Sequence, residues 1–398
     1  MPIAVFALAL CGFGIGTTEF VVMGLLPDIA KDVSVSITTA GGLISGYALG
    51  VVIGGPVLVA SAIRIPRKRM LLALMAIFVL GNLVSALAPS YGLLMVGRIV
   101  TSVCHGAFLG VASVVAAQLV DASRMGRAVS LVFAGGAMAN VLGAPLGTFI
   151  GQNLGWRSTF WMLVGIGVVG FFGIARLVPA IAVSTDTKLS SELGVFRKPQ
   201  VIIGLLMTAL SLGALFTSFT YIAPMLTEVT GYASSALTPL LALFGVGLVV
   251  GNTLGGKMSD RIGLIRTLTL ALAMLAVVLG LFVFTAHAKI PAAITFLLVG
   301  FAGFATVPPL MTRVISKAEG APTLAAVVTV SASNVGIALG AYLGGVTIDA
   351  GLGYTSPNWL GAIMAGLALV LTLVSGAMDR SRTTPAVAAR PEPSPSTN

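Results

Sequence analysis

Two charged side chains stand inside long apolar stretches of the chain. Glu19 lies in GTTEFVVMGLLP (residues 16–27), and Arg98 lies in YGLLMVGRIV (residues 91–100). An unpaired charge at the centre of a bilayer costs about 3 kcal/mol on insertion scales, so such residues are rare and usually serve ion or proton pathways. We therefore interpret Glu19 as a proton-binding group and Arg98 as its partner.

The stretches that hold these charges predict membrane-spanning helices. The chain is 57% hydrophobic and only 9% charged, whereas soluble domains are about 25% charged. The apolar blocks are about 20 residues long, which suits helices that cross a hydrocarbon core, and their continuous apolar character excludes a β-barrel. We expect an all-α membrane protein with twelve transmembrane helices, at 3–27, 38–60, 69–88, 91–119, 127–150, 159–178, 200–227, 234–256, 265–286, 291–312, 323–348 and 358–378.

The net charge of +10 follows the predicted topology. With both termini in the cytoplasm, all but four of the 22 Lys and Arg residues fall on the cytoplasmic side; the exceptions are Lys31, Arg157 and Lys289 in outer loops and Arg98 inside a span. This distribution obeys the positive-inside rule. We expect a multi-pass protein of the inner or plasma membrane whose surrounding partner is the lipid bilayer, and no nucleic-acid partner. The first span is too long for a cleavable signal peptide.

The positions of Glu19 and Arg98 predict an ion pair. Glu19 precedes Pro27 by eight residues and Arg98 follows Tyr91 by seven, which places them roughly 12 Å and 10 Å below the same membrane surface. Protonation of Glu19 would release Arg98 and loosen two helices. The alternative is that the pair only clamps these helices. His105 lies two helical turns after Arg98, where it either relays protons or forms a neutral hydrogen bond.

Other kinds of site have little support. The second histidine, His287, falls in an outer loop, and Cys11 and Cys104 both fall within spans, so we expect neither a metal site nor a disulfide. No nucleotide-binding loop or catalytic triad stands out. We therefore expect no cofactor and no enzymatic activity.

The two halves of the chain repeat each other. Gly213 and Pro224 follow Gly16 and Pro27 by 197 residues, and the same offset relates Gly50, Gly54, Gly143 and Gly147 to Gly247, Gly251, Gly340 and Gly344. Such repeats are typical of transporters. We expect two pseudo-symmetric six-helix bundles at 1–178 and 200–378, joined by a cytoplasmic linker at 179–199. The Pro- and Ser-rich residues 379–398 are expected to form a disordered cytoplasmic tail.

Several motifs resemble the major facilitator superfamily, in its twelve-helix drug:proton antiporter branch. They are Gly97-Arg98 with His105-Gly106, Gly143-Ala-Pro145-Leu-Gly147, Gly155-Trp156-Arg157, Gly256-Lys-Met-Ser-Asp260-Arg261-Ile-Gly263 and Asn334-Val-Gly-Ile-Ala-Leu-Gly340. The last of these and GTTEF…GLLP look like the arabinose-efflux-permease-like and chloramphenicol-efflux-like group. The resemblance implies a proton-driven exporter of small amphiphilic compounds such as chloramphenicol.

The resemblance also implies roles for two motifs. Gly143, Pro145 and Gly147 correspond to the antiporter motif, and Gly256, Asp260, Arg261 and Gly263 correspond to a cytoplasmic gate. The first-half copy of the gate departs from the family pattern, because Val59, Ile63 and Pro66 replace Gly, Asp and Gly while Arg64 and the cluster Arg67–Arg69 are kept. We therefore assign the gate to Asp260 and Arg261.

The substrate surface is inferred from aromatic and hydrogen-bonding residues at apolar positions. The expected contacts are Phe20, Met23, Tyr47, Asn140, Thr217, Thr220, Tyr221 and Asn334. A mostly apolar site with a few polar groups suits a small amphiphilic solute, although ordinary helix packing explains each residue equally well. A sugar efflux permease or a facilitator without proton coupling is the alternative function, and a channel is a more distant one. We expect the transporter to be a monomer.

Overall fold

The computed structural model describes residues 1–61, 65–180, 198–318 and 321–383. These residues form helices and no strands, and twelve of the helical segments among them are long and apolar enough to cross a membrane. The prediction of an all-α protein with twelve transmembrane helices is confirmed. The spans are α1 (Ile3–Gly24), α3 (Ile37–Ser61), α4 (Arg67–Leu87), α5 (Tyr91–Gln118), α6 with α7 (Met125–Met138 and Ala144–Leu154), α8 (Trp156–Leu177), α9 (Pro199–Thr220), α11 (Leu237–Ile262), α12 (Leu264–Thr285), α13 with α14 (Lys289–Ala305 and Val307–Lys317), α15 (Pro322–Thr347) and α16 (Ser356–Thr383).

Proline interrupts several spans that the hydropathy pattern predicts as continuous. The fifth span contains a π-helical turn, Ala139–Gly143, directly before Pro145. Proline has no backbone N–H to bond the carbonyl four residues earlier, so the helical hydrogen bonds must change there. The first span ends at Gly24, and a separate short helix, α2 (Leu26–Asp32), follows it with Pro27 in its first turn. The predicted end at residue 27 was therefore too late.

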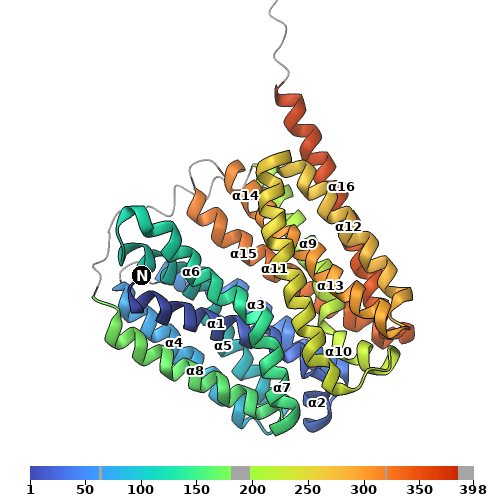
Figure 1. Cartoon of the computed structure of the whole chain (residues 1–398), viewed down its shortest axis with the longest axis horizontal. Coiled ribbons are helices and arrows are strands. Elements are labelled where there is room, and N and C mark those ends of the chain that lie inside the picture. The colour runs from blue at the N-terminus through green and yellow to red at the C-terminus, as the bar shows by residue number, and fades with distance from the viewer. Residues whose placement is uncertain (62–64, 181–197, 319–320, 384–398) are drawn as a thin grey trace, which may run out of the picture.

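The repeated glycines form equivalent contacts in the two halves. A Cβ added at Gly54 of α3 would lie 2.7 Å from the Cα of Val103 in α5, and one added at Gly251 of α11 would lie 2.9 Å from the Cα of Phe301 in α13. Small residues allow membrane helices to approach closely. Since the second span packs on the fourth as the eighth packs on the tenth, the repeat reflects two bundles with the same internal packing (Figure 1).

The two bundles meet near α2, α7 and α10 (Ile222–Pro224), and Figure 1 shows them diverging toward the end where the chain begins. Thr38 Oγ1, at the start of α3, donates to Asp349 Oδ1 after α15 at 2.8 Å. Gln152 Nε2 of α7 donates to the Ser234 carbonyl oxygen before α11 at 2.9 Å. These bonds join the bundles at the end of the molecule farther from the N-terminus. The structure is therefore closed on that side.

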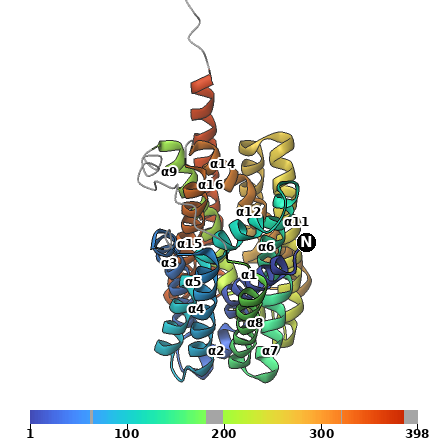
Figure 2. The ribbon, with the colours of Figure 1, turned by 90° about the vertical axis from the view of Figure 1, so that its left-hand side faces the viewer.

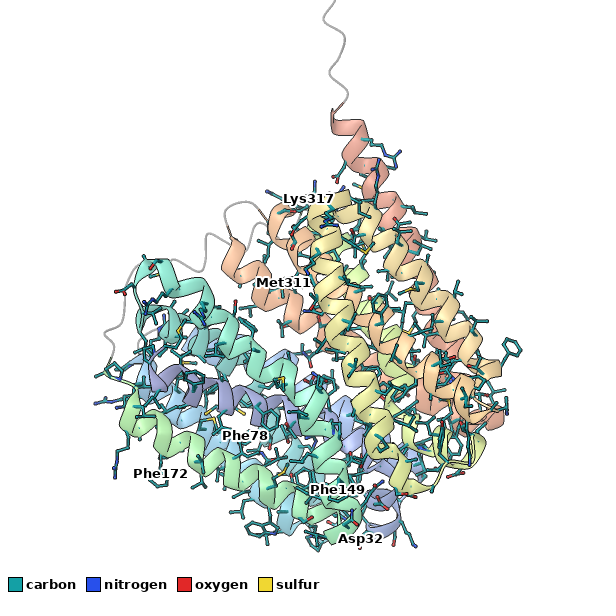
Figure 3. The ribbon with its side chains drawn as sticks, in the orientation of Figure 1. Asp32, Phe78, Phe149, Phe172, Met311 and Lys317 are labelled. Atoms are coloured by element: carbon teal, nitrogen blue, oxygen red, sulfur yellow. The ribbon has the colours of Figure 1, made fainter. Side chains whose placement is uncertain are left out.

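A clasp on the same side ties the first bundle together. Arg157 Nη1 forms an ion pair with Asp32, while Arg157 Nη2 donates to the Ala88 carbonyl oxygen at 2.8 Å. Trp156 Nε1 also donates to Asp32, at 3.1 Å, and the Arg157 guanidinium lies over the Trp156 ring. The Gly155-Trp156-Arg157 motif thus links α2, the end of α4 and the start of α8. Figure 3 shows Asp32 at this end of the molecule and Lys317 at the opposite end.

A partly buried ionic cluster joins the helices of the second bundle at its other end. Arg313 Nη1 and Lys317 Nζ of α14 each donate to Asp379 of α16 at 2.7 Å. Arg313 Nη2 also donates to Ser375 Oγ at 2.6 Å and to Gln200 Oε1 at 3.1 Å. These bonds hold Asp379 in the helix, so α16 continues past the predicted boundary at residue 378 and extends beyond the neighbouring helices in Figure 2. Residues 181–197 of the predicted linker and 384–398 of the predicted tail lie outside the described residues.

The close glycine contacts predict opposite effects for two Gly→Ala substitutions. At Gly336 of α15 the added Cβ would overlap the Ala209 backbone carbonyl of α9, whereas at Gly366 of α16 it would meet nothing within 4 Å. We expect Gly336→Ala to destabilise the purified protein by about 1–3 kcal/mol. Gly366→Ala should leave it unchanged or slightly stabilised, because alanine favours helix. Thermal unfolding of the two variants in detergent tests this, and equal midpoints would contradict the packing argument.

The Asp32 clasp predicts a pH-dependent contribution to stability. Hydrogen bonds from Arg157, and then from Trp156, lower the pKa of Asp32 below its ordinary value. The folded protein therefore gains stability above the unfolded pKa of about 4 and loses it as the pH falls through the lower folded pKa. Because Asp32 is partly exposed, we expect Asp32→Asn to cost at most about 1 kcal/mol at pH 7, and the difference from wild type to shrink below about pH 4. A difference in unfolding midpoint that stays constant from pH 7 to pH 3 would refute the assignment.

Candidate functional site

Glu19 faces His105 rather than Arg98. The Glu19 Oε2 atom of α1 lies 3.9 Å from His105 Nδ1 of α5, and the two side chains are 12% and 11% exposed. No nitrogen of Arg98 lies within 4.0 Å of the Glu19 carboxylate. The prediction of a direct Glu19–Arg98 ion pair is therefore wrong for this conformation. Consecutive residues on a helix point roughly 100° apart, and Arg98 points at position 18 while Glu19 points at His105.

Arg98 is anchored to the backbone beside Glu19. Its Nη1 atom donates to the Thr18 carbonyl oxygen at 2.6 Å and to Thr18 Oγ1 at 3.3 Å. Thr18 Oγ1 in turn donates to Asn82 Oδ1 of α4 at 3.0 Å. These contacts place Arg98 and Glu19 at the same level of the bundle, as the count of helical residues predicted. The guanidinium is almost fully buried, which only a set of acceptors and a nearby negative charge make tolerable.

Tyr47 of α3 connects the two halves of this site. Its hydroxyl forms a 3.1 Å hydrogen bond with His105 Nδ1, and its ring lies under the Arg98 guanidinium at 4.1 Å. Its side chain is buried. A cation over an aromatic face is stabilised when both are shielded from water. Tyr47 therefore contacts both His105 and Arg98 and lines the charged site.

The assembled site brings a carboxylate, an imidazole and a guanidinium close together inside the first bundle. It contains one fixed cation, Arg98, and one carboxylate, Glu19, so protonation of the carboxylate changes its net charge by one unit. Nδ1 of His105 lies 3.1 Å from the Tyr47 hydroxyl and 3.9 Å from Glu19 Oε2, so an imidazole nitrogen stands next to the carboxylate. The Nε and Nη2 atoms of Arg98 have no hydrogen-bond partner among the described residues. No group of three or more His, Cys, Asp or Glu side chains in the described parts of the chain could bind a metal.

The residues expected to contact substrate are all buried in this conformation. The buried set comprises Phe20, Met23, Tyr47, Asn140, Thr217, Thr220, Tyr221 and Asn334. Several are already hydrogen-bonded within the protein. Tyr221 Oη donates to the Ala341 carbonyl oxygen at 2.9 Å, and Asn334 Nδ2 donates to the Val330 carbonyl oxygen at 3.0 Å. Substrate contact at these residues therefore requires another conformation or small movements of the helices.

An aromatic cluster begins at the residue after Glu19 and crosses between the bundles. Phe20 of α1 packs against Phe216 and Phe219 of α9, with ring centroids 5.9 Å and 6.2 Å away. Phe219 then stacks on Phe244 of α11 at 4.3 Å, and Phe244 stacks on Phe296 of α13 at 4.9 Å. Glu19 is thus adjacent in sequence to a direct contact between the two bundles.

The two motifs implied by the resemblance occupy different environments. Gly143 and Gly147 lie where the fifth span packs on α1: a Cβ at Gly143 would overlap Thr17, and one at Gly147 would lie 2.5 Å from Val21 Cγ2. Pro145 lies between these two glycines and is also buried, two residues after the end of the π-helical turn.

The predicted gate residues lie at the C-terminal end of α11. Asp260 and Arg261 are exposed and form no ion pair with any described residue. Gly263 has φ +87° and ends the helix in a conformation that favours glycine. Gly256 leaves room for a side chain, since a Cβ there would meet only Pro308, at 3.9 Å. Ile63 and Arg64 of the first-half copy lie outside the described residues.

The sequence interpretation missed several residues that complete these sites. Thr18 and Asn82 support Arg98, and Phe244 and Phe296 extend the aromatic cluster. A polar side chain at Asn82 in the middle of an apolar span was the one available signal. The phenylalanines gave none, because 19 phenylalanines are spread through the chain.

Comparisons with known proteins agree on one family. The model of the Major Facilitator Superfamily matches residues 8–333. The chain is 46% identical over 369 residues to the inner membrane transport protein YdhP of Escherichia coli O157:H7, covering 93% of this chain and 95% of YdhP. It is 34% identical over 377 residues to the chloramphenicol resistance protein of Streptomyces lividans, covering 93% and 95% of the two chains. A crystal structure of the peptide transporter POT matches with a TM-score of 0.77 at 14% identity over 96% of this chain and 95% of that one, a likeness of fold alone.

The double role of Tyr47 predicts different outcomes for two substitutions. Tyr47→Phe keeps the ring under Arg98 and removes only the hydroxyl, so we expect a loss of about 1 kcal/mol of stability. Tyr47→Leu also removes the cation–π contact and leaves a space, which should cost about 2–4 kcal/mol. Thermal unfolding of the purified variants measures the difference. If both substitutions cost the same, the ring does not stabilise the buried arginine.

Proposed function

The chain belongs to the major facilitator superfamily, so it is a transporter and not an enzyme, and we propose that it is a proton-driven antiporter that exports small amphiphilic compounds. The observation that supports this proposal most is the position of Glu19. A carboxylate within a transmembrane helix, still slightly exposed and 3.9 Å from a histidine nitrogen, is a suitable proton-binding site. The structural alternative, a clasp without a proton, would have favoured a fully buried pair with Arg98.

In the proposed cycle, Glu19 and His105 exchange the proton and Arg98 keeps its charge. The hydrogen bonds of Arg98 to Thr18 and its contact with Tyr47 do not involve Glu19. Protonation of Glu19 therefore leaves a net positive charge inside the first bundle. A charge is less stable where water is excluded, and the exposure of this site to water differs between the two conformations. Protonation of Glu19 therefore favours the conformation in which the site is more hydrated.

The link from proton to conformation runs through α1. Phe20, the residue after Glu19, is the contact between α1 and the aromatic cluster of the second bundle. A small rotation of α1 when Glu19 changes charge would alter this contact between bundles. The π-helical turn before Pro145, with Gly143 and Gly147 on the face toward α1, gives the fifth span room to follow. Asp260 and Arg261 are proposed to form the cytoplasmic gate when the bundles close on that side.

The driving force is sufficient for useful export. A membrane potential of about 100 mV supplies roughly 2.3 kcal/mol per charge moved. At about 1.4 kcal/mol per tenfold change, one proton would sustain a gradient of roughly 50-fold for a neutral substrate. We propose that the protein lies in the inner membrane with both termini in the cytoplasm, as its Lys and Arg distribution favours.

The substrate class is inferred from the apolar character of the surfaces near Glu19 and from one relative. The Phe20 cluster offers flat apolar faces, and Thr217 and Thr220 add polar atoms next in sequence to Phe216 and Phe219. The similarity to a chloramphenicol resistance protein makes chloramphenicol the first compound to test. That molecule combines an aromatic ring with hydroxyl and amide groups, which is the chemistry such a site would take.

The proposal is tested by substrate-triggered proton release from energised inside-out vesicles. Wild type should release protons when chloramphenicol or another amphiphilic compound is added, and Glu19→Gln should reduce this release at least about tenfold at equal expression. The matched control is Glu228→Gln, which removes an exposed carboxylate from an outer segment and should respond as wild type does. Arabinose serves as the sugar comparison.

Each result decides between functions. Release that survives Glu19→Gln would eliminate Glu19 as the proton carrier. Uptake of chloramphenicol into proteoliposomes that saturates without any proton movement would indicate a facilitator instead of an antiporter. A response to arabinose alone would favour the sugar efflux permease.

A further inference from the structure

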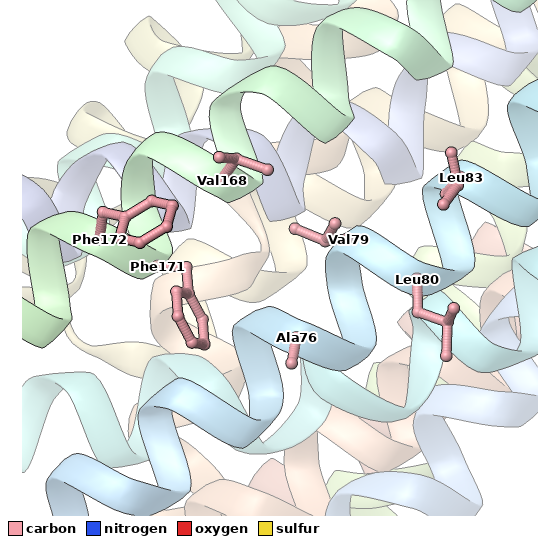
Figure 4. Close-up of a pocket in the computed structure, with 7 residues that line it drawn as sticks. All are labelled: Ala76, Val79, Leu80, Leu83, Val168, Phe171 and Phe172. Carbon is pink, nitrogen blue, oxygen red and sulfur yellow. The ribbon is translucent and has the colours of Figure 1, made fainter.

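An open apolar groove lies on the surface of the first bundle, between α4 and α8. It has a volume of about 430 Å³ and is distinct from the Glu19 site. Figure 4 shows the side chains of α4 on one side of it and those of α8 on the other. Its lining is entirely apolar and consists of Ala76, Val79, Leu80, Leu83, Val168, Phe171 and Phe172. Since both helices are membrane spans, this surface faces hydrocarbon.

The groove has a basic end. On α4, Arg69 lies seven residues before Ala76, which places both on one face of the helix. On α8, Arg176 lies four residues after Phe172, again on the face that lines the groove. Arg69 and Arg176 are both exposed. The helices are antiparallel, so the two arginines lie at the same end of the groove.

A direct contact between the helices fixes the level of this basic end. Lys68 Nζ of α4 donates to the Ala175 carbonyl oxygen of α8 at 2.8 Å. Distances along the helices are counted from Ala175 on α8 and Lys68 on α4, at 1.5 Å per residue. On this scale the groove begins roughly 5 Å away, at Phe172, and ends roughly 22 Å away, at Leu83. One leaflet of a bilayer has a hydrocarbon thickness of about 15 Å. The groove is thus about 17 Å long, close to the thickness of one leaflet, and it passes the bilayer midplane by about 7 Å.

Among the described residues, no acidic side chain pairs with the basic residues at this end. Neither α4 nor α8 contains an Asp or Glu. In the described ranges, no ion pair or hydrogen bond involves the side chain of Arg67, Arg69 or Arg176. Basic pockets between transmembrane helices on the cytoplasmic side are suited to anionic lipid headgroups.

We propose that the groove between α4 and α8 is a binding site for an anionic phospholipid. Its phosphate contacts Arg69 and Arg176, and one acyl chain lies along Ala76, Val79 and Phe172. The observation that selects a lipid is the combination of an apolar groove about as long as one leaflet is thick with a basic end that has no acidic partner among the described residues. This site is independent of the proposed substrate and of proton coupling.

Native mass spectrometry of the full-length protein tests the proposal. Phosphatidylglycerol and phosphatidylcholine with identical acyl chains are titrated separately, and the bound lipid is counted. Wild type should bind phosphatidylglycerol more tightly. The double variant Arg69→Gln/Arg176→Gln should lose about 25-fold in affinity for phosphatidylglycerol, at about fivefold per arginine, and bind phosphatidylcholine as before.

A second variant and two controls keep the result interpretable. Ala76→Trp fills the groove and should weaken binding of both lipids without changing the basic end. Arg124→Gln/Arg127→Gln removes two exposed arginines at the start of α6, and Leu270→Trp adds bulk to an exposed position of α12; both controls should bind as wild type. The proposal is overturned if the Arg69/Arg176 variant keeps its preference for phosphatidylglycerol. It is also overturned if the controls lose as much affinity as the groove variants.

Discussion

The structure of the first bundle depends on stabilising the charge of a buried arginine. Arg98 is nearly inaccessible, and a guanidinium cannot lose its charge inside the protein. The bundle meets this constraint with the Thr18 carbonyl, the Tyr47 ring and the nearby carboxylate of Glu19. Two spans, α1 and α3, contribute these groups to an arginine on a third span, α5. Their mutual positions are therefore fixed by one side chain, and Glu19 keeps a defined place without being neutralised by a direct ion pair.

The position of Glu19 next to His105 changes the chemistry expected of the site. A tight Glu19–Arg98 pair would have bound the carboxylate too well to exchange a proton readily. In the structure the permanent charge is held by backbone and aromatic groups, while the two titratable side chains face each other. One part of the site thus holds a permanent charge, and the other part holds the side chains to which we assign the proton. This division is consistent with the proposed antiport.

Contacts within each bundle differ in kind from contacts between the bundles. The Asp32–Arg157 clasp stabilises the first bundle on its closed side, and Arg313, Lys317 and Asp379 stabilise the second bundle at the opposite end. Both clusters join helices within one bundle. Contacts between bundles are instead formed by the aromatic cluster, glycine-rich surfaces and single hydrogen bonds such as that of Thr38 with Asp349. A rocking motion requires bundles that are rigid internally and joined to each other by weaker contacts.

The amino-acid sequence by itself determined the fold class, the twelve spans and the family. Apolar blocks of bilayer length permit only helices, and the glycine and proline repeat at an offset of 197 residues defines two equivalent bundles. It also placed Glu19 and Arg98 at one depth, because depth follows from the helical rise. The direction of each side chain around its helix was decided only by the tertiary structure. Helix rotation and interhelical packing turned Arg98 toward Thr18 and Glu19 toward His105, and they assembled Phe20, Phe219 and Phe244 from three helices. Hydrophobic periodicity carries little information on rotation when a helix is apolar on all sides, which is why depth was predictable and pairing was not.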